Sequence, residues 1–162
     1  PPVHPGTKLN FPPTIGGAQL AHSYTQPIGR NVRYVYEYDI DRMRISLFLF
    51  DEGRRVPSGS ENSMVTSQFT SEIEATEKVA KTDGFTAFEK PSVPSACTYG
   101  SITFRCVVYS AQAGHGRVYS KLMMTGYRDH FLKVRIDWAQ SLNQTSADAD
   151  RALRAFIPAL VR

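Results

Sequence analysis

Alternating apolar and polar residues indicate three consecutive strands in the second half of the chain. The runs cover residues 102–109, 118–127 and 132–138, and glycine-containing or charged turns separate them. A period of two indicates strands that bury one face, and turns at this spacing join them into an antiparallel meander. We therefore expect another layer of the protein to cover the apolar face of this meander.

Two further strands are predicted before the meander. Residues 32–38 alternate between two sets of side chains, with three tyrosines on one face. Residues 43–50 carry apolar side chains on both faces, which is typical of a central strand or of one covered by a helix.

Two segments have the periodicity of amphipathic helices. The first covers residues 61–81, with Ser60 as its N-cap, and its charged residues, Glu72 among them, lie largely off the apolar stripe. The second begins near Ser146 with carboxylates in its first turn, and Pro158 is expected to end or kink it.

The order of these elements predicts a single α+β domain. Turns rather than helices join the central strands, which argues against a doubly wound parallel fold. With short strands also expected at residues 8–11 and 85–89, we expect a central antiparallel sheet of about six to seven strands, layered with two main helices. Residues 1–7 are rich in proline and are expected to form a flexible tail, so the domain covers residues 8–162.

The start of the chain bears on where the protein acts. It begins Pro1-Pro2-Val3 without methionine, and no apolar run approaches the roughly 20 residues of a membrane-spanning helix. Trimming of a tag, removal of methionine before proline, or removal of a signal peptide would each leave such an end. We expect the last of these, which would place the protein in the periplasm or outside the cell, with the cytoplasm as the open alternative.

Charge gives little sign of a polyanionic partner. The net charge is +4, and the basic residues are spread along the chain beside acidic ones. A nucleic-acid-binding domain usually shows a basic stripe or a known module. We therefore expect no specific nucleic-acid partner.

The two cysteines, Cys97 and Cys106, allow two interpretations. Their even number and short separation permit one disulfide, as an oxidising compartment would favour. Cys106 also alternates with apolar residues, so it can equally be a small buried hydrophobic side chain.

The sequence contains no recognisable motif of a catalytic or metal-binding site. There is no phosphate-binding loop, dinucleotide fingerprint, nucleophile elbow or zinc-protease motif. A metal needs three or four converging donors, whereas His4, His22, His115 and His130 are scattered through the tail and the turns. We expect no metal, no cofactor and no catalysis.

Tyrosines are the least ordinary feature that remains. They combine apolar area with a polar tip, which suits interfaces and ligand clefts as well as packing under a helix. The candidate binding surface consists of Tyr34, Tyr36, Tyr38, Tyr109, Tyr119 and Tyr127.

Two segments resemble a set of uncharacterised bacterial proteins that are commonly predicted to be exported. They are Phe11-Pro12-Pro13-Thr14-Ile15-Gly16-Gly17, and Asp51-Glu52-Gly53 with Val56-Pro57-Ser58-Gly59. The element order over most of residues 8–162 is also similar to the PsbP-like fold group, in which a central antiparallel sheet lies between helices. This resemblance implies an accessory, assembly or binding role, and it supplies no catalytic residues to carry over.

These observations predict an exported, non-catalytic binding or accessory module that acts through protein–protein contact. The alternative is a small-molecule carrier that holds its ligand between the sheet and a helix. The partner is thus an unknown protein or an unknown small ligand.

Overall fold

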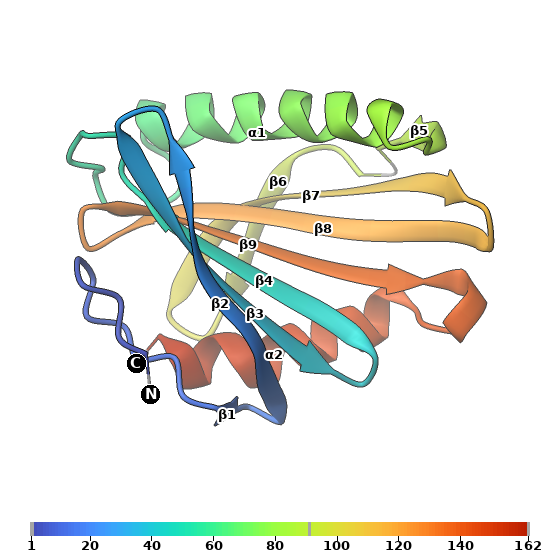
Figure 1. Cartoon of the computed structure of the whole chain (residues 1–162), viewed down its shortest axis with the longest axis horizontal. Coiled ribbons are helices and arrows are strands. Elements are labelled where there is room, and N and C mark those ends of the chain that lie inside the picture. Colours follow the sequence, from blue (N-terminus) through green and yellow to red (C-terminus); the bar gives the residue numbers. More distant parts are fainter. Residues whose placement is uncertain (1, 91, 162) are drawn as a thin grey trace.

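The strands form one antiparallel sheet in the order β1-β2-β3-β4-β9-β8-β7-β5, and β6 also pairs with β7. The computed structural model describes residues 2–90 and 92–161 (Figure 1). Within them the strands are β1 (Thr14–Ile15), β2 (Ala18–Ile28), β3 (Asn31–Ile40), β4 (Met43–Phe50), β5 (Thr86–Glu89), β6 (Ser95–Tyr99), β7 (Ile102–Ala113), β8 (Gly116–Tyr127) and β9 (His130–Ala139). Strands β7, β8 and β9 are the predicted meander.

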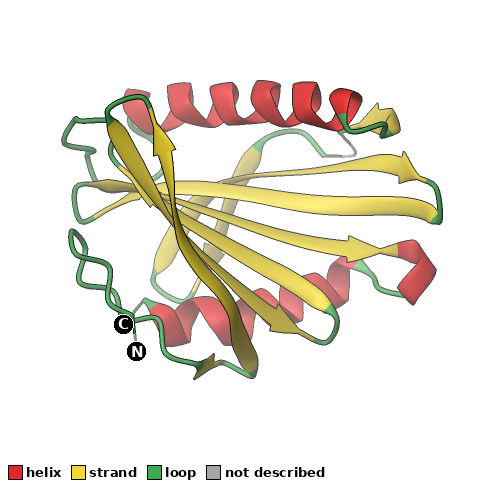
Figure 2. Ribbon diagram, viewed as in Figure 1, coloured by secondary structure: helices red, strands yellow, loops and turns green. Residues whose placement is uncertain are grey.

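One helix covers each face of the sheet (Figure 2). Helix α1 (Ser63–Thr82) packs on the face that includes Phe50, Leu122 and Phe131. Helix α2 (Ser146–Leu160), which follows the short 3₁₀ turn η1 (Gln140–Leu142), packs on the opposite face. The α+β class, the central antiparallel sheet and the two main helices are therefore confirmed.

Side-chain caps determine where both helices begin. The Asn62 side chain accepts a hydrogen bond from Val65 N at 2.9 Å, so Asn62 rather than the predicted Ser60 caps α1. Thr145 and Asp148 form a capping box at the start of α2, which satisfies two backbone donors that the helix cannot pair itself. Pro158 lies inside the last turn, and α2 ends at Leu160.

The face under α2 contains the larger core. Alternate residues of β3 point into it, so Tyr36 and Tyr38 are buried together with Trp138 of β9 and Phe156 of α2. The Tyr38 hydroxyl donates to Pro12 O at 2.7 Å, which gives the buried polar tip a partner. Burying a large apolar side chain contributes roughly 1.5–3 kcal/mol, so this core stabilises the sheet strongly.

Residues 2–11 do not extend away from the domain. The sequence predicts a flexible tail over residues 1–7, yet Val3 bridges to Asn10, and His4 and Thr7 are buried. His4 Nδ1 accepts a hydrogen bond from Thr7 N at 2.9 Å, and Arg128 donates to Thr7 O at 2.7 Å. These contacts hold the segment against the sheet, while residue 1 lies outside the described residues.

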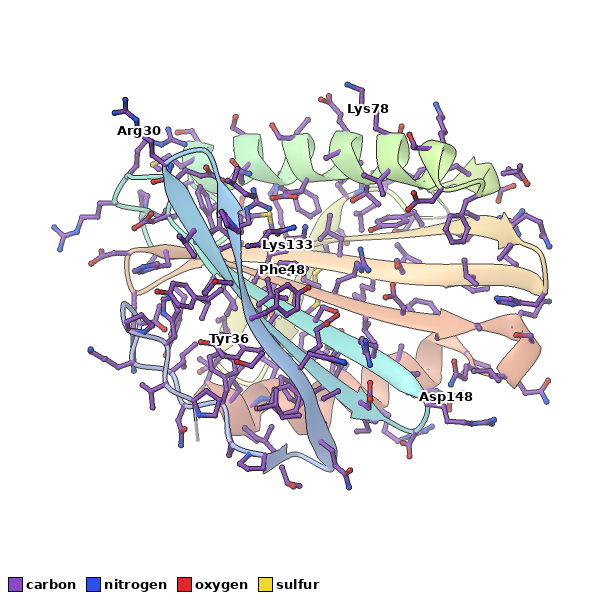
Figure 3. All side chains as sticks on the ribbon, viewed as in Figure 1. Arg30, Tyr36, Phe48, Lys78, Lys133 and Asp148 are labelled. Atoms are coloured by element: carbon purple, nitrogen blue, oxygen red, sulfur yellow. A yellow bond between two sulfur atoms is a disulfide. The ribbon has the colours of Figure 1, made fainter. Side chains whose placement is uncertain are left out.

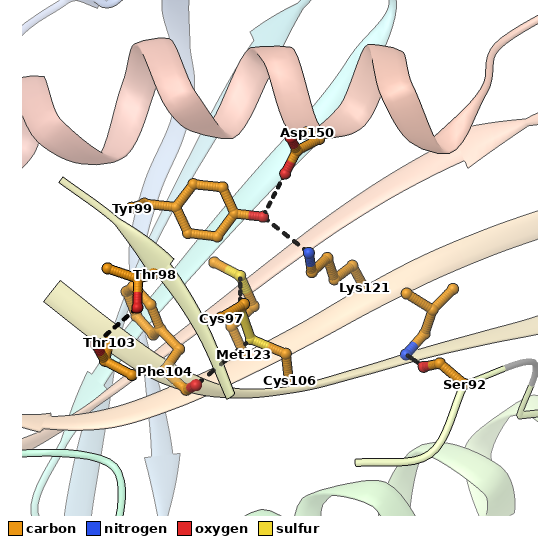
Figure 4. The surroundings of a disulfide bond; sticks show 11 residues. Ser92, Cys97, Thr98, Tyr99, Thr103, Phe104, Cys106, Lys121, Met123 and Asp150 are labelled. Carbon is orange, nitrogen blue, oxygen red and sulfur yellow. Dashed lines mark hydrogen bonds between the residues drawn. A yellow bond between two sulfur atoms is a disulfide. The ribbon is translucent and has the colours of Figure 1, made fainter. Parts of the chain in front are cut away.

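A disulfide joins Cys97 of β6 to Cys106 of β7 (Figure 4). Beside it, Tyr99 connects the sheet to α2: its hydroxyl accepts from Lys121 Nζ at 2.8 Å and donates to Asp150 Oδ1 at 2.8 Å. The disulfide and this chain of hydrogen bonds fix the short strand β6 at the edge of the sheet.

The described residues contain nine strands, against the six to seven expected from the sequence. Strand β2 carries almost no apolar pattern because most of its residues are exposed. Strands β1 and β6 are only 2 and 5 residues long. Alternation of apolar and polar residues identifies strands that bury one face, so the sequence pattern does not reveal these exposed or short strands.

Candidate functional site

A cavity of about 670 Å³ lies between the second half of α1 and the sheet. Its wall on the helix side runs from Glu72 to Asp83, and strands β2 to β5 and β7 to β9 supply the rest. The volume falls within the range of roughly 300–1,000 Å³ that is usual for small-molecule sites. Polar side chains from β2, β3, β7, β8 and β9 line it, together with polar side chains of α1.

The strand register brings a polar row to this cavity. Tyr109 of β7 is paired with Ser120 of β8, which is paired with Asp137 of β9. Directly paired residues place their side chains on the same face of the sheet. Arg135 and Lys133 follow on the same face of β9 at intervals of two residues. A sheet face that would ordinarily be apolar under a helix is therefore polar here.

A buried ion cluster lies at one end of the cavity. Glu72 of α1 is only 6% exposed, and its carboxylate lies 3.0 Å from Lys133 Nζ and 2.9 Å from an Arg33 nitrogen. Arg33 also pairs with Glu52 at 3.0 Å, and its guanidinium lies over the Phe50 ring. The cluster therefore ties α1 to β9 and to β3.

Burial and the neighbouring charges shift the pKa values of Glu72 and Lys133 within the cluster. Burial by itself raises the pKa of the Glu72 carboxyl, but the charges of Lys133 and Arg33 outweigh burial and hold that pKa below its usual value. Burial lowers the pKa of Lys133, and the attraction of Glu72 offsets only part of this effect. Lys133 also lies over the Phe48 ring, at 4.5 Å from its centroid (Figure 3).

A second polar group lies nearer the end of α1. An Arg135 nitrogen is 3.4 Å from Asp137 Oδ2, and the Ser120 hydroxyl donates to Asp137 Oδ1. The nearby Asp137 charge raises the pKa of the Arg135 guanidinium, which stays charged. Burial raises the pKa of Tyr109, so its hydroxyl stays protonated and remains a donor.

Three buried polar atoms among the described residues have no hydrogen-bond partner, and all three belong to residues that line the cavity. They are Arg33 Nε, Arg135 Nε and the Tyr109 hydroxyl. The hydroxyl lies near Thr76 and Ser120 but makes no hydrogen bond of ordinary geometry with either. Leaving a buried donor unsatisfied costs about 1–3 kcal/mol, so acceptors inside the cavity would stabilise this arrangement.

Apolar and aromatic side chains form the remaining walls. The ring of Phe88 stacks on that of Tyr109, with the centroids 5.4 Å apart. Val79 and Ile28, which are 57% and 37% exposed, contribute apolar surface at the rim. The cavity can thus hold a molecule with an apolar body and polar substituents.

Most of the predicted tyrosine surface lies elsewhere. Tyr36 and Tyr38 are buried in the core under α2, and Tyr34, Tyr119 and Tyr127 pack against the same core. Tyr119 stacks on Trp138 there and also contributes to the cavity wall. Tyr109 points to the α1 face and is the one predicted tyrosine whose hydroxyl belongs to the polar group described above.

The sequence does not identify the charged residues of the cavity. The prediction that Glu72 lies off the apolar stripe is wrong, because residues 65, 69, 72 and 76 follow each other at steps of four, three and four, which is one helical face. Lys133, Arg135 and Asp137 alternate with apolar residues, a pattern that is typical of an edge strand with its polar side in solvent or at the rim of a surface. Strand β9 instead lies between β4 and β8 in the middle of the sheet.

In the described part of the chain, no three His, Cys, Asp or Glu side chains are arranged to hold a metal ion. Neither helix is long and apolar enough to span a membrane, as far as the described residues go. Comparisons with protein-family models, with curated proteins and with solved structures found no match to the chain.

Proposed function

We propose that the protein binds a small organic molecule in the cavity between α1 and the sheet, and that it acts as a carrier or ligand-binding module rather than as an enzyme. The observation that carries this proposal is the coincidence of the cavity with three buried donors that have no partner. A bound molecule with acceptor atoms would satisfy them, and the aromatic wall would bury its apolar part.

A role in protein–protein contact, the first expectation from the sequence, has less support. The tyrosines proposed for such a surface are mostly packed in the core under α2. A contiguous exposed apolar patch of several hundred Å² is typical of a partner surface. Of the large exposed apolar residues, Tyr24, Ile28 and Val32 lie on the paired strands β2 and β3, whereas Val3, Val79, Val93 and Leu142 lie on other segments.

Export remains part of the proposal. The Cys97–Cys106 disulfide supports it, because disulfides persist in the periplasm and outside the cell but are rare in a reducing cytoplasm. The absence of recognisable catalytic groups in the sequence supports a binding role.

Native mass spectrometry of protein purified gently from its own host tests the proposal. We expect a mass above that of the chain by roughly a few hundred daltons, the size of molecule that such a cavity encloses, and we expect it to be lost on denaturation. A bare chain would contradict the carrier, and a co-purified protein in its place would support protein–protein contact instead.

A further inference from the structure

The charges that line the cavity cancel one another. Three basic and three acidic side chains line it: Arg33, Lys133, Arg135, Glu72, Asp83 and Asp137. Glu72 pairs with two of the cations and Asp137 with the third, while Asp83 is exposed at the end of α1. A charged ligand would therefore find no unpaired side chain of opposite charge inside the cavity. A buried charge is costly unless it is paired.

The unsatisfied polar groups can all donate. Arg33 Nε and Arg135 Nε can only donate, and the protonated Tyr109 hydroxyl can donate as well as accept. A ligand that supplies acceptor oxygens is complementary to all three groups, whereas a ligand that supplies only N–H donors can pair with the Tyr109 hydroxyl alone. A purely apolar ligand would leave the donors unpaired.

The apolar walls favour a flat ligand body. The Phe88 and Tyr109 rings stack as a pair on the β5 and β7 side, and Phe48 of β4, whose ring lies under Lys133 Nζ, also lines the cavity. Aromatic faces pack best against other flat rings in offset or edge-to-face geometry.

We infer that the ligand is an uncharged aromatic or fused-ring molecule that carries carbonyl or ether oxygens, which accept hydrogen bonds from Tyr109 and the two arginine Nε groups. This inference rests on the proposed function, and it adds the charge and polarity of the molecule. It also assigns Tyr109 as a residue that distinguishes oxygen-bearing ligands from plain hydrocarbons.

Four naphthalene probes that differ in one substituent test the inference. They are 2-acetylnaphthalene, 2-ethylnaphthalene, 2-naphthoate and 1-(2-naphthyl)ethylammonium, added to the full chain at pH 7 and followed by amide chemical shifts. We expect the ketone to bind most tightly, by about 5- to 10-fold over the hydrocarbon, which corresponds to one hydrogen bond of typical strength. The shifts should map to α1, β7 and β9.

Tyr109→Phe removes the hydroxyl and keeps the ring. We expect it to bring the affinity for the ketone close to that for the hydrocarbon, while hydrocarbon binding stays the same. Tyr24→Phe is the matched control, because Tyr24 is 46% exposed and does not line the cavity. It should leave the affinity for all four probes unchanged.

The other possible results each contradict a different part of the inference. Tighter binding of the naphthoate or of the ammonium probe would overturn the uncharged ligand while keeping a ligand-binding cavity. Equal binding of ketone and hydrocarbon would overturn the role of the donors. If no probe binds, the inference fails, and the native mass of the host-purified protein then shows whether the proposed function fails with it.

Discussion

Lys133 on β9 and Glu72 on α1 form a buried ion pair, with Nζ and Oε2 3.0 Å apart. Both side chains are less than 10% exposed. The pair joins the middle of the sheet to the helix that covers it, so it fixes the position of α1 over the cavity. The energetic coupling between Lys133 and Glu72 can be measured with a double-mutant cycle.

Substituting one partner of this pair should destabilise the protein more than substituting both. Glu72→Leu leaves Lys133 buried without its counter-charge, and removing one partner of a buried pair typically costs about 3–5 kcal/mol. Glu72→Leu combined with Lys133→Met removes both charges. We expect the loss of unfolding free energy in the double variant to be smaller, by about 2 kcal/mol or more, than the sum of the losses of the two single variants. Urea denaturation of the wild type, the two single variants and the double variant gives these free energies. Additivity within about 0.5 kcal/mol would show that the two groups are not coupled.

His4 should make stability depend on pH in mildly acid solution. Burial lowers the pKa of His4 to about 4 from its ordinary value of 6.5, and the charges of His130 and Lys8 lower it further against the opposing charge of Asp51. The folded protein therefore binds fewer protons than the unfolded chain between these two pH values, and stability falls as the pH decreases from 6.5 towards 4. The contribution is at most about 3 kcal/mol.

His4→Gln isolates this effect. The variant keeps a polar side chain without the titration, so the difference in unfolding free energy between wild type and variant should shrink as the pH falls from 6.5 to 4. Above pH 6.5 the difference should be constant. A difference that stays constant throughout would mean that His4 titrates normally in the folded protein.

The disulfide should contribute to stability although its loop is short. Cys97 and Cys106 are 9 positions apart in the sequence, and closing a loop of this length is expected to stabilise the protein by about 2–3 kcal/mol through the unfolded state. Replacing both residues by alanine should lower the free energy of unfolding by that amount, in guanidinium denaturation without reductant. As a control, adding a reductant should lower the stability of the wild type but not that of the double variant.

Gly126 should tolerate no side chain. Strand β8 meets the loop before α1 here, since Gly59 and Gly126 exchange backbone hydrogen bonds at 3.0 and 2.9 Å. A Cβ at Gly126 would collide with the backbone carbonyl of Pro57, whereas one at Gly114 would meet nothing within 4 Å. We expect Gly126→Ala to destabilise by about 2 kcal/mol or more and Gly114→Ala to change little. Thermal unfolding compares the two, and equal melting temperatures would contradict the close approach.

This close approach gives a physical reason for one of the turn segments noted in the sequence. Val56 bridges to Asp129 and Gly59 bridges to Gly126, so the Val56–Gly59 segment runs beside the ends of β8 and β9. Proline and glycine in that segment indicate a turn, but the sequence does not show which strand lies beside it.

The meander and the two helices could be predicted because each buries one face and therefore repeats at a regular period. The charged residues of the cavity could not be predicted in the same way. Lys133 and Arg135 alternate with buried apolar residues as the polar side of any half-exposed strand would. Their burial depends on β4 and β8 lying on either side of β9, a long-range arrangement that local periodicity does not contain. Glu72 was detectable only by its exact place on the helical stripe.

The measurement that tests the central claim most directly is native mass spectrometry of a variant in which the cavity is filled. Ala80 lines the cavity on α1, whereas Ser71 is exposed on the same helix and does not line it. Ala80→Phe and Ser71→Phe are purified from the native host, and circular dichroism checks that both are folded. We predict that the folded Ala80→Phe protein has lost the extra mass carried by the wild type and that Ser71→Phe retains it. If folded Ala80→Phe still carries that mass, the ligand does not bind between α1 and the sheet.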